Sequence, residues 1–155
     1  MIKILFVCHG NICRSPMAEF VLKDLVARNG LTGQVAVASA ATSQEEIGND
    51  VHPGARRKLA EAGVPCEKRK ARQMVAQDYA VYDYLIGMDS ANIRNMQRIC
   101  GGDGQHKIHR LLEYAGSNAD IADPWYTGNF EETYDDVLRG CNGLLREIGQ
   151  RLNRQ

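Results

Sequence analysis

Residues 8–16 combine a cysteine, small residues and an arginine in the order Cys-His-Gly-Asn-Ile-Cys-Arg-Ser-Pro. A short apolar run at 4–7 comes directly before them, and a helical pattern of apolar residues follows. A loop that leads from a strand into a helix points successive backbone N–H groups at one spot, and the helix dipole adds positive potential there. Arg14 can hold two oxygens of a phosphate with its planar guanidinium, which a lysine could not do. The segment therefore predicts a pocket for a tetrahedral anion.

Cys8 is the predicted nucleophile of this loop. A helix N-terminus and a neighbouring cation favour the thiolate, which is the form of cysteine that attacks phosphorus. Ser15 is placed to donate a hydrogen bond to the sulfur, while Gly10 and Asn11 allow the backbone to curl around the anion. A buried cysteine and an ordinary helix-capping serine would explain each residue alone. The combination at this spacing favours catalysis.

A general acid has to come from elsewhere in the chain, because an expelled oxygen leaves more easily when it is protonated. The segment Asp123-Pro124-Trp125-Tyr126 is the best candidate, since the proline stiffens the position of the aspartate and the two aromatic side chains could flank a phenyl ring. The same residues also fit a turn before the last helix, with Trp125 in the core. The residues themselves leave both interpretations open.

A zinc site is the alternative for the thiols and imidazoles of the sequence, namely Cys8, His9, Cys13, His106 and His109. Their spacing lacks two paired clusters, and Arg14 would repel a dication. We therefore expect no metal, and we expect His106 and His109 to lie on the surface.

Composition excludes several classes of protein. The chain has 155 residues, and its 19 basic and 19 acidic side chains cancel, which gives no reason to expect nucleic acid or a membrane as partner. No apolar run approaches the roughly 20 residues that a membrane span needs. The first residues lack the features of a signal peptide, and the five cysteines are an odd number. We expect one domain, residues 1–155, in the cytoplasm with reduced thiols.

Short apolar runs alternate with helical patterns along the chain. Strands are expected at 4–7, 35–38, 84–88 and 107–111. One helix is expected to open at Ser15 as its cap with proline in the first position, and another to run over 53–63 with Leu59 and Ala60 inward. Further helices are expected from about Ser90 and from Phe130, after Asn129 as cap. This alternation predicts a parallel sheet covered on both faces, with a ligand at the carboxyl ends of its strands.

The loop and several later segments together resemble the low-molecular-weight protein tyrosine phosphatase family. The segments are Met17-Ala18-Glu19, Ser39-Ala40-Ala41-Thr42-Ser43, Ala71-Arg72-Gln73, Tyr82-Asp83-Tyr84, Met88-Asp89 and Asp123-Pro124. They occur in the family's order, from the first strand to the last helix. A Cys-x5-Arg-Ser-Pro start with a distant Asp-Pro is a highly specific pattern.

The resemblance implies an α/β fold in a single three-layer domain, with a four-stranded parallel sheet of flavodoxin-like topology flanked by helices. It implies hydrolysis of phosphotyrosine in proteins through a cysteinyl-phosphate intermediate, with no metal or organic cofactor. Cys8 would be the nucleophile, Arg14 the phosphate clamp, and Asp123 the acid and then the base for the hydrolytic water.

Further site residues follow from the same resemblance. Asn11, Ser15 and Ser39 match family positions that hold the loop in shape through hydrogen bonds. The expected phosphate-binding or substrate-binding residues are His9, Gly10, Asn11, Ile12, Cys13, Ser15, Glu45, Trp125 and Tyr126. The implied partners are phosphotyrosine-containing proteins, with inorganic phosphate and similar oxyanions as competitive ligands, and the chain is expected to be a monomer or to self-associate weakly. A disulfide between Cys8 and Cys13 is expected after mild peroxide treatment.

Three positions depart from the family pattern and bear on which substrates fit. Glu45 stands where many relatives carry an aromatic residue at the rim of the cleft, and Trp125 replaces a common tyrosine. Arg69 stands where several animal relatives have histidine. It belongs to the basic run Lys68-Arg69-Lys70-Arg72, which we expect to be a solvated face.

Three other functions fit the sequence less well. A thioredoxin-coupled arsenate reductase needs two more cysteines able to relay a disulfide, and Cys66 and Cys100 are isolated in the sequence. A phosphocarrier domain of sugar transport has little use for Arg14 and Asp123 in these roles. An arginine-phosphate phosphatase is the nearer rival, although an apolar Ile12 suits a tyrosyl ring better than a guanidinium group.

Overall fold

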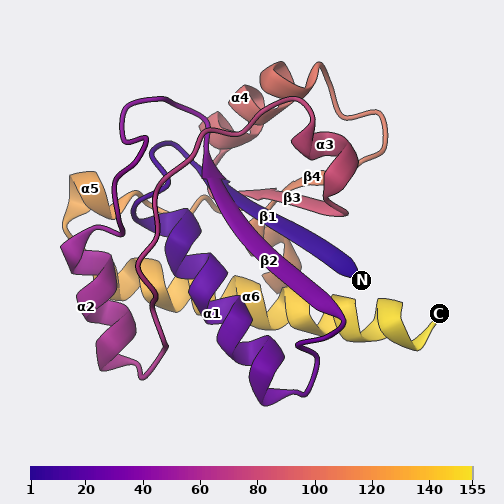
Figure 1. The fold of residues 1–155 in the computed structure, drawn as a ribbon, viewed down its shortest axis with the longest axis horizontal. Helices are drawn as coiled ribbons and strands as arrows, with labels where there is room; N and C mark the ends of the chain where they lie inside the picture. Colours follow the sequence, from indigo (N-terminus) through magenta and orange to yellow (C-terminus); the bar gives the residue numbers. More distant parts are fainter. Residues whose placement is uncertain (155) are drawn as a thin grey trace.

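A computed structural model describes residues 1–154 and contains a four-stranded parallel sheet (Figure 1). The strands are β1 (Ile2–Cys8), β2 (Val35–Ala41), β3 (Tyr84–Gly87) and β4 (Ile108–Arg110). Their order in the sheet is β2-β1-β3-β4, and all the pairs are parallel. This arrangement confirms the expected α/β fold, and the order matches the first four strands of a flavodoxin-like sheet.

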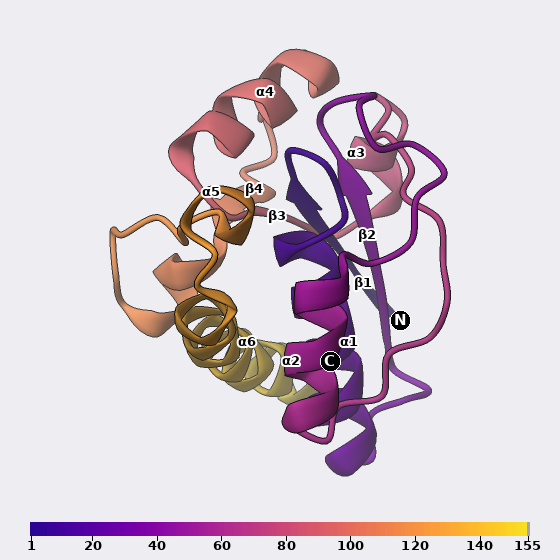
Figure 2. The same ribbon diagram turned by 90° about the vertical axis from the view of Figure 1, so that its left-hand side faces the viewer.

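Helices cover both faces of the sheet, as Figure 2 shows. One face is covered by α1 (Arg14–Arg28), α2 (Pro53–Glu61) and α6 (Phe130–Asn153), and the other by α3 (Asp78–Val81) and α4 (Ser90–Cys100). The 3₁₀ helix η1 (Leu111–Ala115) and the short α5 (Pro124–Thr127) lie between β4 and α6 in the chain. No helix within residues 1–154 is long and apolar enough to cross a bilayer.

β1 is buried on both faces, as a strand between two helical layers must be. Its side chains alternate: Ile4 and Phe6 pack toward α1 and α6, whereas Leu5 and Val7 pack toward α4. The apolar stripe expected on the last helix is present, and Asn129 caps that helix by accepting a hydrogen bond from the backbone N–H of Glu132. Tertiary burial therefore follows the apolar patterns of the sequence.

Two expected details of the helices are wrong. The first helix begins at Arg14 with Cys13 at the cap position, so Ser15 does not cap it; the Ser15 hydroxyl bonds Asn11 and lies beside Cys8 instead. In α2 the inward positions are Ala55 and Leu59, which are one turn apart, whereas the next residue along, Ala60, faces solvent.

The order in which strands are added to the sheet reverses at β1, since β2 lies on one side of β1 and β3 on the other. Ligands of such sheets bind beyond the carboxyl ends of the strands at this switch point. Cys8 ends β1, and Asp89 follows the end of β3. The fold thus brings the predicted nucleophile to the expected edge.

Candidate active site

The loop after β1 presents its carbonyl groups outward. The carbonyl oxygens of Cys8, His9 and Ile12 accept hydrogen bonds from the backbone N–H groups of Thr42, Ser43 and His52, at 2.9, 3.0 and 2.8 Å. Within the described chain, the N–H groups of residues 10–14 make no hydrogen bond. Because the C=O and N–H of a trans peptide point in opposite directions, these three bonded carbonyls turn the N–H groups of the following residues, His9, Gly10 and Cys13, to the inner side of the loop. The loop is therefore a cradle for an anion.

A chain of buried polar side chains supports the loop from behind. Asn11 donates through Nδ2 to the hydroxyl oxygens of Ser15 (2.8 Å) and Ser39 (2.9 Å). Ser39 donates to the carboxylate of Glu19 at 2.6 Å. The Ser15 oxygen accepts from Asn11, so its hydrogen can be donated either to the Cys8 sulfur at 3.1 Å or to the Ala40 carbonyl at 3.5 Å, of which the sulfur is nearer. The Ser15 backbone N–H also points at that sulfur at 3.4 Å. Two donors are thus aimed at Cys8.

Asn11 and Ser15 do not line the pocket; both are buried behind it. The side chain of Asn11 can reach its two serine partners because its backbone is left-handed, with φ of 59°. Asparagine tolerates this conformation better than most residues. Ser39 lies at the carboxyl end of β2, where it joins the loop to the neighbouring strand.

Arg14 is almost fully buried and lies among acceptors. Its Nη1 donates to the Asp89 carboxylate at 2.6 Å and to the Ile121 carbonyl at 2.9 Å, and its Nη2 lies 3.3 Å from Asp123. Burial lowers the pKa of Arg14, but the neighbouring Cys8 and Asp89 outweigh burial and leave the pKa above its ordinary value. The cation is therefore fixed beside the nucleophile.

Asp123 is held at the start of α5. Its Oδ1 accepts from the backbone N–H of Trp125 at 3.0 Å, which makes it the cap of that short helix, and its Oδ2 faces Arg14. Trp125 is 56% exposed and Tyr126 is 82% exposed. The interpretation in which Trp125 is a core residue is therefore wrong, because the capped turn places both aromatic rings at the surface beside the pocket.

One pocket of about 100 Å³ unites these groups. Its lining residues are Cys8, His9, Gly10, Ile12, Cys13, Arg14, Glu45, Glu46, Asp123, Trp125 and Tyr126. Glu45 lies at the rim, where its carboxylate contacts His9 Nε2 at 2.9 Å. The structure thus gathers most of the expected site residues around Cys8.

Cys13 is buried next to the pocket at the cap position of α1. Burial, followed by the nearby Cys8, raises the pKa of Cys13 to about 12. Cys13 is therefore a thiol at neutral pH, and the five cysteines are all free. The disulfide between Cys8 and Cys13 stays a prediction.

Several residues of the site do not stand out in the sequence. Glu19 supports Ser39, Glu46 lines the pocket, and Asp89 pairs with Arg14. Glu19 and Asp89 stand in segments that resemble the family, but no role is assigned to them there. Asp89 also comes directly after a predicted strand, which places it at the same edge of the sheet as Cys8.

The basic run is not a solvated face throughout, which corrects that expectation. Lys68 and Lys70 are exposed, but the guanidinium of Arg69 donates to the backbone carbonyls of Asn11 and Asn49. Arg72 pairs with Asp78 at 3.1 Å. The reason is that this segment is bonded to its neighbours on both sides: Ala71 exchanges backbone hydrogen bonds with Gly48 and Asn49, and Gln73 forms a bridge with Ala41 of β2, so that Arg69 lies beside the loop after β1.

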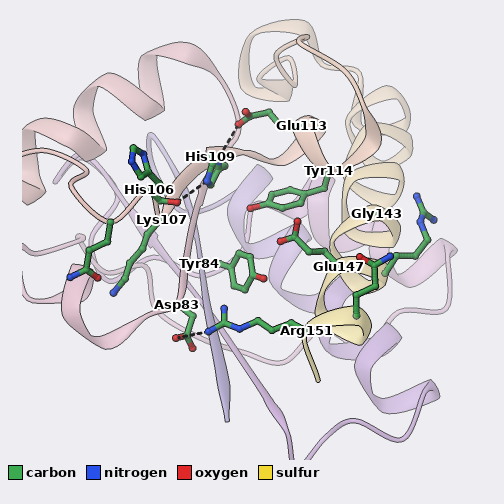
Figure 3. Close-up of a pocket in the computed structure, with 13 residues that line it drawn as sticks. Asp83, Tyr84, His106, Lys107, His109, Glu113, Tyr114, Gly143, Glu147 and Arg151 are labelled. Atoms are coloured by element: carbon green, nitrogen blue, oxygen red, sulfur yellow. Dashed lines mark hydrogen bonds and ion pairs between the residues drawn. The ribbon is translucent and has the colours of Figure 1, made fainter. Parts of the chain in front are cut away.

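A larger hollow than the pocket around Cys8 lies away from that residue (Figure 3). This open groove of about 720 Å³ runs between β4, η1 and the second half of α6. Two pairs of its titratable groups are in contact, Asp83 with Arg151 at 3.5 Å and Glu113 with His109 at 3.6 Å. His109 is half-buried beside Tyr114, and His106 is exposed, as expected. Residues 1–154 contain no cluster of three or more potential metal ligands.

Comparisons with known proteins agree with this geometry. Residues 3–155 match the family model described as "Low molecular weight phosphotyrosine protein phosphatase". The chain is 43% identical to the low molecular weight protein-tyrosine-phosphatase YfkJ of Bacillus subtilis over 150 residues, which cover 96% of each protein. The crystal structure of YfkJ superposes with a TM-score of 0.94 at 42% identity, covering 97% of this chain and 96% of the other.

Two further solved structures are similar. The low molecular weight protein tyrosine phosphatase SP-PTP of Streptococcus pyogenes has a TM-score of 0.86 at 39% identity, covering 96% of this chain and 93% of its own. The drosophila arginine phosphatase DARP has a TM-score of 0.86 at 30% identity, covering 95% and 98%.

Proposed function

Because this chain belongs to the low molecular weight phosphotyrosine protein phosphatase family, we propose that it hydrolyses phosphotyrosine in proteins with Cys8, Arg14 and Asp123 as its catalytic residues. The observation that carries this proposal is the convergence of a donor-stabilised sulfur, a fixed guanidinium and a capped carboxyl group on one pocket. Residues 1–155 would act as one catalytic domain. The five free cysteines support a cytoplasmic location.

The first step forms a cysteinyl phosphate. The Cys8 thiolate attacks phosphorus in line, so that an S–P bond forms while the P–O bond to the tyrosyl oxygen breaks. Asp123, in its protonated form, gives its proton to the departing oxygen. Arg14 and the inward N–H groups of the loop bind the other three oxygens, where negative charge must be stabilised.

The second step hydrolyses the intermediate. Asp123, now a carboxylate, takes a proton from a water molecule whose oxygen attacks phosphorus. The S–P bond breaks and the thiolate of Cys8 is restored, stabilised by the hydroxyl of Ser15 at 3.1 Å. Inorganic phosphate leaves, and Asp123 is again protonated for the next cycle.

The shape of the pocket favours an aromatic phosphate ester. The sulfur of Cys8 lies at its foot and the residue is 3% exposed, so that a phosphate needs a long arm to reach it. Ile12 offers an apolar contact to a ring, and Trp125 and Tyr126 can flank the ring at the rim. A phosphoserine side chain is too short for this geometry.

The test of the mechanism uses two variants. Cys8→Ser should abolish turnover while inorganic phosphate still binds in calorimetry. Asp123→Asn keeps an acceptor for the Trp125 N–H but cannot donate a proton, so hydrolysis of phenyl phosphate should fall by about 10²–10⁴-fold, with a smaller loss for an activated nitrophenyl ester. Equal losses for both esters would show that Asp123 is not the acid.

The test of the substrate compares peptides that carry phosphotyrosine, phosphoserine or phosphoarginine in one sequence context. We expect phosphotyrosine to be preferred strongly. The similarity to DARP makes phosphoarginine the informative control. Equal specificity constants for phosphoarginine and phosphotyrosine would contradict the proposal.

A further inference from the structure

Arg69 links two segments that are far apart in the sequence. Its guanidinium donates to the carbonyl oxygen of Asn11 in the loop after β1 and, at 3.2 Å, to that of Asn49. Its own backbone N–H donates to Asp50 at 3.2 Å. The side chain is thus anchored on the 49–50 segment and reaches across to the loop.

The peptide group between Asn11 and Ile12 is the part of the loop that Arg69 contacts. Asn11 has φ of 59°, a conformation that an L residue other than glycine adopts at a cost. In a planar trans peptide the N–H points opposite to the C=O. An Asn11 carbonyl held outward by Arg69 therefore directs the N–H of Ile12 toward the pocket.

We propose that Arg69 is a positioning residue, which fixes the Asn11–Ile12 peptide so that the Ile12 N–H binds an oxygen of the phosphate. This inference rests on the proposed function for its consequence in turnover, but it makes a claim about anion binding that stands without turnover.

Other contacts hold Asn11 but do not control this peptide. Its Nδ2 bonds Ser15 and Ser39, and its Oδ1 accepts from the backbone N–H of Arg72 at 3.3 Å. These bonds fix the side chain, whereas the carbonyl group is bonded by Arg69 alone within the described chain. A charged donor also polarises the peptide, which strengthens its N–H as a donor on the other side.

Arginine suits this position because its fork can serve two carbonyl groups at once, which an ammonium does with poorer geometry. Burial lowers the pKa of Arg69, while Glu19 and Cys8 act in the opposite sense. The guanidinium remains charged at physiological pH, because arginine is not deprotonated in proteins. It therefore adds positive potential near the phosphate site.

Arg56 offers a matched control. It donates to the Cys66 carbonyl at 3.1 Å and to Asp50 at 2.8 Å, so it braces the same neighbourhood without touching the loop after β1. Arg56→Met and Arg69→Met each remove one guanidinium group together with the hydrogen bonds that it makes in this neighbourhood. Only the second should disturb anion binding.

The experiment measures binding of inorganic phosphate to the full chain by calorimetry, together with kcat and KM for nitrophenyl phosphate and unfolding in urea. For Arg69→Met we expect the phosphate dissociation constant to rise about tenfold or more and kcat to fall, because a hydrogen bond to a charged group is lost. Arg69→Lys should recover part of the loss. Arg56→Met should keep the dissociation constant within about twofold at a similar loss of stability.

A second measurement does not depend on stability. In the wild-type chain, phosphate should shift the amide NMR signal of Ile12, and in Arg69→Lys this shift should shrink. A phosphate affinity unchanged in Arg69→Met, or lowered equally in Arg56→Met, would overturn the inference. Phosphate binding without hydrolysis of any phosphate ester in the wild type would instead contradict the proposed function.

Discussion

Arg14 divides its hydrogens between the protein and the pocket. Both hydrogens of Nη1 are used, by Asp89 at 2.6 Å and by the Ile121 carbonyl at 2.9 Å, and one of Nη2 faces Asp123 at 3.3 Å. Of the five N–H donors of the guanidinium, those on Nε and the second on Nη2 remain. They share one edge of the planar group, which is the arrangement that binds two phosphate oxygens together. Asp89 thus leaves this edge of Arg14 available to the pocket that Arg14 lines.

Replacing Asp89 with asparagine tests this role. Asn is as good a helix cap as Asp, so the bond from the Asn92 N–H at 2.7 Å to residue 89 can persist while the negative charge beside Arg14 is lost. We expect the phosphate dissociation constant to rise about tenfold, because hydrogen bonds to charged groups are worth about 1.5–3 kcal/mol. Calorimetry with inorganic phosphate measures this change.

Asp89→Ala is the companion variant, since it removes the cap as well. It should lose about 1 kcal/mol more in free energy of unfolding than Asp89→Asn, with a similar loss of phosphate affinity. Wild-type phosphate affinity in Asp89→Asn would mean that Asp89 serves α4 alone.

Single residues differ in how far sequence reasoning can place them. Cys8, Arg14 and Ser15 belong to one strand–loop–helix segment, so local geometry alone brings them together. Asp89 and Arg69 act through contacts with residues far along the chain, and no local pattern reports such contacts. A basic run looks the same in a sequence whether its side chains are solvated or bonded to a backbone.

α6 and η1 pack so closely that two positions of α6 have no room for a side chain. A Cβ added at Gly143 would overlap the carbonyl oxygen of Tyr114, and one added at Gly140 would overlap the side chain of Leu111. Backbone atoms cannot move aside as a flexible side chain can. Gly143 is therefore needed for η1 to pack on α6.

Gly143→Ala should lower the free energy of unfolding by about 1–3 kcal/mol, the usual range for overpacking. Gly149 is the control, because a Cβ added there meets no atom within 4 Å. Gly149→Ala should stabilise the same helix by about 0.5–1 kcal/mol, since alanine is the better helix former. Urea unfolding of the two variants should shift in opposite directions, and a stabilised Gly143→Ala would show that the packing between η1 and α6 is loose.

The sequence predicts secondary structure correctly where a stretch of apolar residues is long enough to show its pattern. The stripe on α6 and the apolar runs of β1 and β3 identify these elements correctly. The short α3, α5 and η1 were missed, because a helix of one or two turns has no period to detect and depends on its caps. Asp123 at the cap of α5 shows the consequence: its capping role emerges only from the bond with Trp125.

At the scale of the whole molecule, the parallel sheet assembles the site. Its carboxyl edge gathers the loop after β1, the end of β2 and α5 (Figure 1). Asp89 after β3 and Asp123 before α5 join this edge through their contacts with Arg14. The alternation of strands and helices predicts this edge, and the positions of Cys8 and Asp89 agree with it. The distant Asp123 could be assigned only through the family resemblance, because both of its interpretations fit the local sequence.

Net charge gives the molecule no long-range field for steering. The formal charge is zero, so selection among phosphoproteins depends on charges near the pocket. Glu45 and Glu46 are the carboxylates of the rim, in addition to Asp123. The Glu45 carboxylate contacts His9, but the Glu45 side chain is 70% exposed and remains accessible to a substrate. The rim should therefore disfavour acidic residues beside the phosphotyrosine.

Glu45→Gln tests this preference with two phosphotyrosine peptides, one with acidic and one with basic neighbours. We expect the wild type to prefer the basic peptide and the variant to lose part of that preference, by up to about fivefold in the ratio of kcat/KM values, because exposed charge pairs contribute about 0.2–1 kcal/mol. This difference between the wild type and Glu45→Gln should become smaller at high salt, since screening weakens interactions between exposed charges. Glu67→Gln, which removes another exposed carboxylate that does not line the pocket, should leave the ratio unchanged. If Glu45→Gln and Glu67→Gln give the same ratio at low salt, Glu45 does not read the substrate, and preference must come from the aromatic side of the rim at Trp125 and Tyr126.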